Sequence, residues 1–160
     1  MEMGNRENAL LAPHVQTPNQ SPPIPLPGGG SIRILATAAQ TGNAMGAVEV
    51  TLPPGGGARG WMHIHKNEDE WVYVLEGKLL CIVGDTKIEA EAGTFIYGPR
   101  NIAHGLRPVG SSPTRFIESF VPAGLEELFS NPKELITYLT EGQSPVTTKY
   151  NVEVVGPMPE

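Results

Sequence analysis

Short apolar runs separated by turn residues make up most of the chain after Ser31. Examples are "EWVYVLEG", "KLLCIVGD", "TKIEAEAG" and "TRFIESFVP". The chain has 19 glycines and 16 prolines in 160 residues, and these residues interrupt helices and form turns. Strands this closely spaced predict an all-β antiparallel sandwich or barrel. We expect hairpin corners at Gly77 and Gly84, because glycine adopts the positive φ that tight turns often need.

The N-terminal end differs from this pattern. The segment "APHVQTPNQSPPIPLPGGG" is rich in proline, which fixes φ and has no amide hydrogen, so it forms neither a helix nor a central strand. We therefore predict an extended N-terminal arm over residues 1–30 and a domain over residues 31–160. The arm is either disordered or packed along its own or a partner subunit.

A pair of short C-terminal helices is expected within about residues 123–140. Leucines recur at helical spacing in "AGLEELFSNPKELITYLTEG", and Pro132 suits the first turn of a second helix. These helices either cover one barrel end as a lid or pack only as a structural cap. The final "NVEVVGPMPE" contains a short apolar run that can add an edge strand.

The charge composition argues against two classes of binding partner. The net charge is −6 and no cluster of Lys or Arg occurs, which argues against binding to nucleic acid or to an anionic membrane surface. No stretch approaches the roughly 20 apolar residues of a membrane helix, and the N-terminal apolar run is too short for a signal peptide. The single cysteine, Cys81, cannot form an internal disulfide. We expect a cytoplasmic protein whose partner is a small molecule.

The segment "GWMHIHKNEDEW" carries a possible metal site. In an extended strand, His63 and His65 project from the same face, and a tight corner through the polar "KNED" can bring Glu70 beside them. His104 supplies a third imidazole on another strand. Such donors suit Fe, Ni, Mn, Co, Cu or Zn. The alternative interpretation is a pair of polar surface histidines on one strand.

Two longer segments resemble the motifs of the cupin superfamily. "GARGWMHIHKNEDEWVYVLEG", from Gly57 to Gly77, is similar to the first cupin motif, and "GTFIYGPRNIAHGLRP" is similar to the second. Pro108 stands where the second motif usually ends in Asn. The resemblance implies a double-stranded β-helix, or jelly-roll barrel. It also implies a divalent transition metal held by four ligands: His63, His65, Glu70 and His104.

In this resemblance only Glu70 of the three consecutive acidic residues falls at the ligand position. We therefore expect Glu68 and Asp69 to be solvated loop residues.

A looser resemblance concerns the reaction. "EWVYVLEGKL", "FVPAGLEELF" and "KYNVEVVGPMP" resemble single-domain cupins grouped with quercetin (flavonol) 2,3-dioxygenases. This implies an oxidoreductase that acts on an aromatic, enolisable substrate and O2, with Glu70 as the catalytic base. Two alternatives remain open: a non-oxidative isomerase, cyclase or lyase of secondary metabolism, and a ligand-binding cupin without turnover. Cupins of this size often pair through their sheets, so the resemblance also implies a homodimer.

Period-two counting suggests which residues form a substrate pocket. It places Trp61 on the face of His63, and Val72 follows Glu70. Ile102 and Leu106 flank His104 on its own face. Such an apolar wall suits an aromatic ligand, although for any single one of these residues ordinary core packing is the simpler interpretation. Trp71 and Tyr73, if outward, form an apolar face suited to subunit packing.

Overall fold

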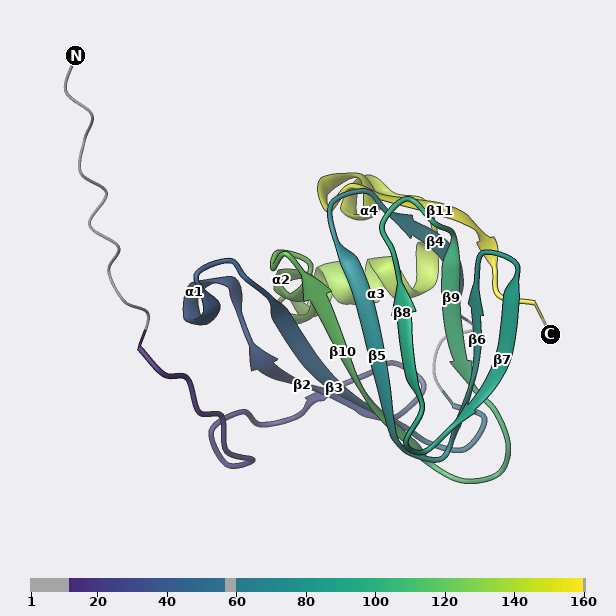
Figure 1. Cartoon of the computed structure of the whole chain (residues 1–160), viewed down its shortest axis with the longest axis horizontal. Helices are drawn as coiled ribbons and strands as arrows, with labels where there is room; N and C mark the ends of the chain where they lie inside the picture. The colour runs from purple at the N-terminus through teal and green to yellow at the C-terminus, as the bar shows by residue number, and fades with distance from the viewer. Residues whose placement is uncertain (1–11, 57–59, 160) are drawn as a thin grey trace, which may run out of the picture.

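Two antiparallel sheets face one another in the computed structural model, which describes residues 12–56 and 60–159 (Figure 1). The six-stranded sheet has the order β1-β2-β3-β10-β5-β8. Its strands are β1 (Ile24–Pro25), β2 (Ser31–Ala36), β3 (Gly46–Leu52), β10 (Thr114–Val121), β5 (Asp69–Glu76) and β8 (Phe95–Gly98). The predicted all-β jelly-roll architecture is confirmed.

The second sheet has five strands in the order β11-β4-β9-β6-β7. They are β11 (Val152–Pro157), β4 (Trp61–His65), β9 (His104–Pro108), β6 (Lys78–Val83) and β7 (Thr86–Glu91). Strand β11 pairs with β4 at the sheet edge, as the apolar run near the C-terminus predicts.

The core lies between the sheets and follows from period-two alternation. In β5, Glu70, Val72 and Val74 are buried, whereas Tyr73 faces out. The buried side chains of β10 belong to the same layer, with Phe116 opposite Val74. Inward positions of both sheets therefore build one apolar interior.

The two hairpin corners form at the glycines where they were expected. Gly77 (φ 74°) joins β5 to β6, and Gly84 (φ 55°) joins β6 to β7. At Gly77 a Cβ atom would also collide with the carbonyl oxygen of Pro113. Glycine is needed there for both conformation and space.

The described part of the arm runs along the sheet edge and ends in β1, where Ile24 pairs with Ile32 of β2. Strand β2 ends at Ala36 and is followed by the helix α1 (Ala38–Thr41). The physical reason is a capping arrangement, because the side chain of Gln40 accepts a hydrogen bond from the Thr37 amide at 2.9 Å.

Three helices follow β10, namely α2 (Glu126–Ser130), α3 (Pro132–Glu141) and α4 (Pro145–Lys149). The first two occupy the stretch where helices were predicted. Pro132 opens α3, and the Asn131 side chain caps it by accepting a bond from the Glu134 amide at 3.2 Å. Helix α4 was not predicted. No helix in the described ranges is long and apolar enough to cross a membrane.

The outer face of β5 and β8 carries aromatic side chains. Tyr73 pairs with Phe95, which is 59% exposed, and Trp71 pairs with Tyr97. The rings of Trp71 and Phe95 lie 5.9 Å apart. An apolar outer face was expected from Trp71 and Tyr73. The homodimer stays a prediction.

Glu126 is a buried carboxylate with a structural role. Its two oxygens accept hydrogen bonds from the amides of Ala38 (2.7 Å) and Gly124 (2.6 Å), which joins α1 to α2.

We expect Glu126→Ala to lower the free energy of unfolding by about 2 kcal/mol or more, because two buried amides lose charged acceptors. Urea unfolding measures this. Glu127→Ala, which replaces an exposed neighbour, is the control. If both substitutions change the free energy of unfolding equally little, the structural role of Glu126 is contradicted.

Candidate metal centre

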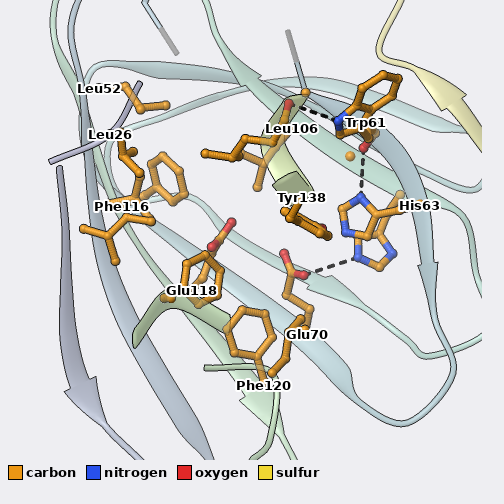
Figure 2. Close-up of a pocket in the computed structure, with 18 of the residues that line it drawn as sticks. Leu26, Leu52, Trp61, His63, Glu70, Leu106, Phe116, Glu118, Phe120 and Tyr138 are labelled. Carbon is orange, nitrogen blue, oxygen red and sulfur yellow. Dashed lines mark hydrogen bonds and ion pairs between the residues drawn. The ribbon is translucent and has the colours of Figure 1, made fainter. Parts of the chain in front are cut away.

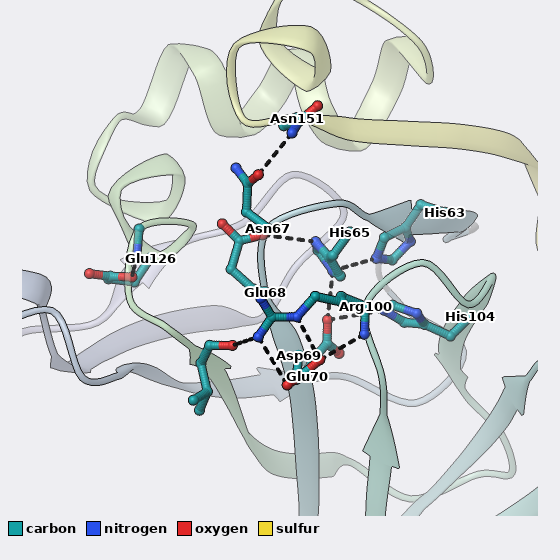
Figure 3. A network of polar contacts seen from close by, with 12 residues as sticks. His63, His65, Asn67, Glu68, Asp69, Glu70, Arg100, His104, Glu126 and Asn151 are labelled. Atoms are coloured by element: carbon teal, nitrogen blue, oxygen red, sulfur yellow. Dashed lines mark hydrogen bonds and ion pairs between the residues drawn. The ribbon is translucent and has the colours of Figure 1, made fainter.

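Four side chains from three strands converge at one end of the interior (Figure 3). His63 and His65 come from β4, Glu70 from β5 and His104 from β9. One ligand atom from each lies within 4.8 Å of all the others. The structure thus brings together the four residues that were expected to bind a metal.

Strand register produces this convergence. His63 is directly opposite His104 in the β4–β9 pair, and His65 lies two residues along on the same face. Glu70 reaches the cluster from the facing sheet. Asn101 (φ 65°) turns the chain before β9, and its amide donates to the His65 carbonyl at 2.8 Å. Gly57, the first glycine of the motif resemblance, lies outside the described residues.

Backbone carbonyls orient two of the imidazoles. His63 Nδ1 lies 2.8 Å from the Trp61 carbonyl oxygen, and His104 Nδ1 lies 2.9 Å from that of Ile102. Each Nδ1–H donates to its carbonyl, so in the neutral imidazole Nε2 carries the lone pair, directed into the cluster. Metal-binding histidines are oriented in the same way.

The distances inside the cluster suit a single ion. The Nε2 atoms of His63 and His65 are 3.1 Å apart, and His65 Nε2 lies 2.9 Å from Glu70 Oε2. Ligand atoms about 2.1 Å from one ion and at right angles to each other are separated by about 3 Å. Imidazole and carboxylate donors without thiolate suit Fe, Ni, Mn, Co, Cu or Zn. The residues present therefore fit a divalent transition metal.

Burial and mutual charge set the protonation states. Burial, with the neighbouring His65 and His104, lowers the pKa of His63 to about 3, so this imidazole is neutral. Burial alone would raise the pKa of Glu70, but hydrogen bonds and charges from His104 and His65 hold it well below its usual range. Burial opposes the charged form of His104 too, yet Glu70 raises the pKa of this imidazole overall. Glu70 therefore stays ionised within the cluster, beside the neutral imidazole of His63.

The expectation that the two acidic residues before Glu70 are solvated loop residues is wrong for Glu68, and Asp69 lies within β5 with a partly exposed, ion-paired side chain. Glu68 is only 5% exposed, and its Oε2 lies 3.9 Å from His65 Nδ1. Neither atom has a hydrogen-bond partner among the described residues. Asp69 instead binds Arg100 through contacts of 3.0 Å and 3.1 Å, and this ion pair joins β5 to the corner before β9 (Figure 3).

A cavity of about 130 Å³ opens beside the cluster (Figure 2). Trp61 and Leu106 line it, as expected, together with other mainly apolar side chains. Val72 does not reach this cavity and lines a smaller adjoining one. Ile102 lies outside both and is 41% exposed. Strand β9 begins only at His104, so period-two counting does not extend back to Ile102.

Several wall residues were missed by sequence reasoning. Tyr138 and Leu139 reach the cavity from α3, and Trp61 Nε1 donates to the Leu139 carbonyl at 3.2 Å. Helix α3 therefore covers the cavity, which favours the first of the two roles considered for the helices. Glu118 of β10 was also missed. Its signal was present in "TRFIESFVP", where it is a charged residue at an inward position between two phenylalanines.

Comparison with known proteins agrees with this architecture. Residues 48–120 match the family model described as a cupin domain. The chain has a cupin fold. The structure of an RmlC-like cupin from Shewanella frigidimarina aligns with a TM-score of 0.58 at 19% identity, covering 72% of this chain and 96% of that one. KdgF from Halomonas sp. aligns with a TM-score of 0.61 at 17% identity, covering 73% and 100%. The family model covers less than half of the chain, and the two solved structures share its fold.

Among curated proteins, the chain is similar to the tetracenomycin polyketide synthase protein TcmJ of Streptomyces glaucescens. The two are 27% identical over 95 residues, which is 59% of this chain and 62% of that protein. An uncharacterized protein of Methanocaldococcus jannaschii is 30% identical over 61 residues, 38% of this chain and 49% of the relative. The matched region thus spans less than two thirds of each of these curated relatives.

Removing one imidazole should weaken metal binding. We expect His104→Ala to lower the affinity for Zn²⁺ or Mn²⁺ by about 100-fold or more, since the remaining ligands leave the ion incompletely bound. Titration calorimetry and metal content after purification measure this. His14→Ala is the matched control, because His14 bonds to the Leu35 carbonyl outside the cluster. Equal metal content in both variants would refute the site.

Glu68 should help to hold His65. We expect Glu68→Ala to lower metal affinity by about tenfold without a comparable loss of stability, because a carboxylate near Nδ1 orients the ring. Glu89→Ala, which removes an exposed carboxylate, serves as the control. Metal affinity and melting temperature are measured for both variants. If Glu68→Ala binds metal as tightly as Glu89→Ala, Glu68 has no such role.

Proposed function

We propose that the chain is a metal-dependent enzyme acting on an aromatic, enolisable small molecule, with a flavonol-dioxygenase-like oxidation as the first candidate. One observation carries this proposal: three imidazole nitrogens and one carboxylate oxygen converge beside an apolar, partly aromatic cavity. The looser resemblance of "EWVYVLEGKL", "FVPAGLEELF" and "KYNVEVVGPMP" to dioxygenase-like cupins supports the choice of reaction.

A divalent transition metal bound there would supply Lewis acidity, which lowers the pKa of an enol or phenol. His63, His65 and His104 would hold it through Nε2. Glu70 has the additional task of accepting a proton. Its Oε2 bonds to His65 and His104, whereas its Oε1 has no hydrogen bond within the described part of the chain. Glu70 would take the proton of the substrate hydroxyl as the general base.

The wall of the cavity would orient the substrate and exclude water. Phe116 and Phe120 face Trp61 and Tyr138 across the cavity in Figure 2, and Leu106 closes another side. Flat aromatic rings pack well between such side chains. A dry cavity also strengthens the interaction between Glu70 and the substrate proton.

A non-oxidative reaction is the second candidate. The similarity to a protein named as part of a polyketide synthase favours a polyketide substrate. The same proton transfer to Glu70 would then lead to isomerisation, cyclisation or elimination without O2. A cupin that only binds its ligand would show metal and ligand binding but no consumption of substrate.

The role of Glu70 can be tested by replacing its carboxylate. We expect Glu70→Gln to retain measurable metal and to lose activity by about 100-fold or more, since the amide cannot accept the proton. O2 uptake and substrate loss are followed with quercetin in the metal-loaded protein, with Glu89→Gln as the control. Substrate turnover without O2 uptake would contradict the dioxygenase candidate and favour the non-oxidative one. If Glu70→Gln keeps its activity, Glu70 is not the general base.

A further inference from the structure

Glu118 is a carboxyl group within the apolar part of the cavity. It lies on β10 between the inward residues Phe116 and Phe120 and lines the cavity with them. Figure 2 shows its carboxyl group directed into the cavity, on the same side as that of Glu70. The β5–β10 register places Phe120 opposite Glu70 and Glu118 opposite Val72. Glu118 and Glu70 are therefore diagonal neighbours, about 7–8 Å apart in such a sheet.

Unlike Glu70 and Glu126, Glu118 has no structural partner in the described part of the chain. Glu126 accepts two backbone amides, and Glu70 contacts two imidazoles. No hydrogen bond or ion pair to Glu118 is formed by the described residues. Burial, reinforced by the charge of Glu70, raises the pKa of Glu118 well above its usual range. A carboxyl group in this environment lowers stability and does not hold the fold together.

The position itself is suited to an apolar residue. Its neighbours along and across the strands are Phe116, Phe120 and Val72, which all belong to the buried core. A polar group that faces an apolar cavity without a protein partner is typical of the few groups that fix the orientation of a ligand. In either protonation state a carboxyl group can hydrogen-bond a hydroxyl group.

We propose that Glu118 is a second recognition point for the substrate and hydrogen-bonds an oxygen remote from the oxygen held at the histidine cluster. The cavity would then select an aromatic molecule with two separated oxygen functions, one beside Glu70 and one beside Glu118. This inference rests on the proposed function, because it assumes that the substrate lies against the cluster. It adds the requirement of a second oxygen function on the substrate, which the metal ligands alone do not impose.

Two flavonols serve as probes. 3-Hydroxyflavone has only the chelating hydroxyl and carbonyl, whereas quercetin carries further hydroxyls on both ring systems. Binding to the full-length, metal-loaded protein is measured by fluorescence for the wild type, Glu118→Leu and Glu118→Gln. Leucine fills the site without hydrogen bonding, and glutamine keeps a donor and an acceptor. Glu89→Leu makes the same substitution at an exposed site on β7.

We expect Glu118→Leu to bind quercetin about tenfold or more weakly and 3-hydroxyflavone within about twofold of the wild type. Glu118→Gln should stay within about threefold for both. The melting temperature of Glu118→Leu should rise by a few degrees, because an unpaired carboxyl group leaves the interior. If Glu118 had only a structural role, Glu118→Leu would lower stability and would weaken the binding of both flavonols alike.

The outcomes separate the two proposals. If the wild type binds neither flavonol, the proposed function fails and the role of Glu118 fails with it. If the wild type binds both and Glu118→Leu weakens them equally or not at all, the proposed function stands and the second recognition point is refuted. A lower melting temperature of Glu118→Leu, with Glu89→Leu unchanged, would also overturn the view that Glu118 serves the ligand.

Discussion

The register between β4 and β9 is the constraint on which the candidate site depends. It sets His63 opposite His104, although the two residues are 41 positions apart in the sequence. A shift of one residue would turn one of these imidazoles to the outer face of the sheet. Glu70 comes from the facing sheet, so the cluster also requires the two sheets to pack at their present distance. The candidate metal centre is thus a property of the whole barrel.

Three inward-facing carboxylates illustrate how environment assigns different roles to one side chain. Glu126 satisfies backbone amides and joins two helices. Glu70 is surrounded by imidazoles and remains an anion. Glu118 faces apolar neighbours and is driven toward its neutral form. The first serves the fold, and we propose that the other two serve proton transfer and substrate recognition.

Local patterns in the sequence were enough to predict most of the strands, the corners at Gly77 and Gly84 and the capped helix that starts at Pro132. The four residues of the cluster could be named because the motif fixes their spacing. Residues whose position depends on the path of the chain outside regular strands were harder to place. Ile102 lies in a turn, where alternation has no meaning, and α3 brings Tyr138 to the cavity through packing that no local pattern encodes. Glu68 was misjudged because polar loops are usually solvated, whereas this loop folds back onto His65.

The most direct test of the account is the position of a metal in crystals of the protein. Crystals grown with Zn²⁺ or Mn²⁺ would be measured at the absorption edge of the metal, and the anomalous difference map would locate it. The account predicts one strong peak about 2.0–2.3 Å from the Nε2 atoms of His63, His65 and His104 and from a Glu70 oxygen. A map with no peak among these four residues, or with the metal bound only elsewhere, would contradict it.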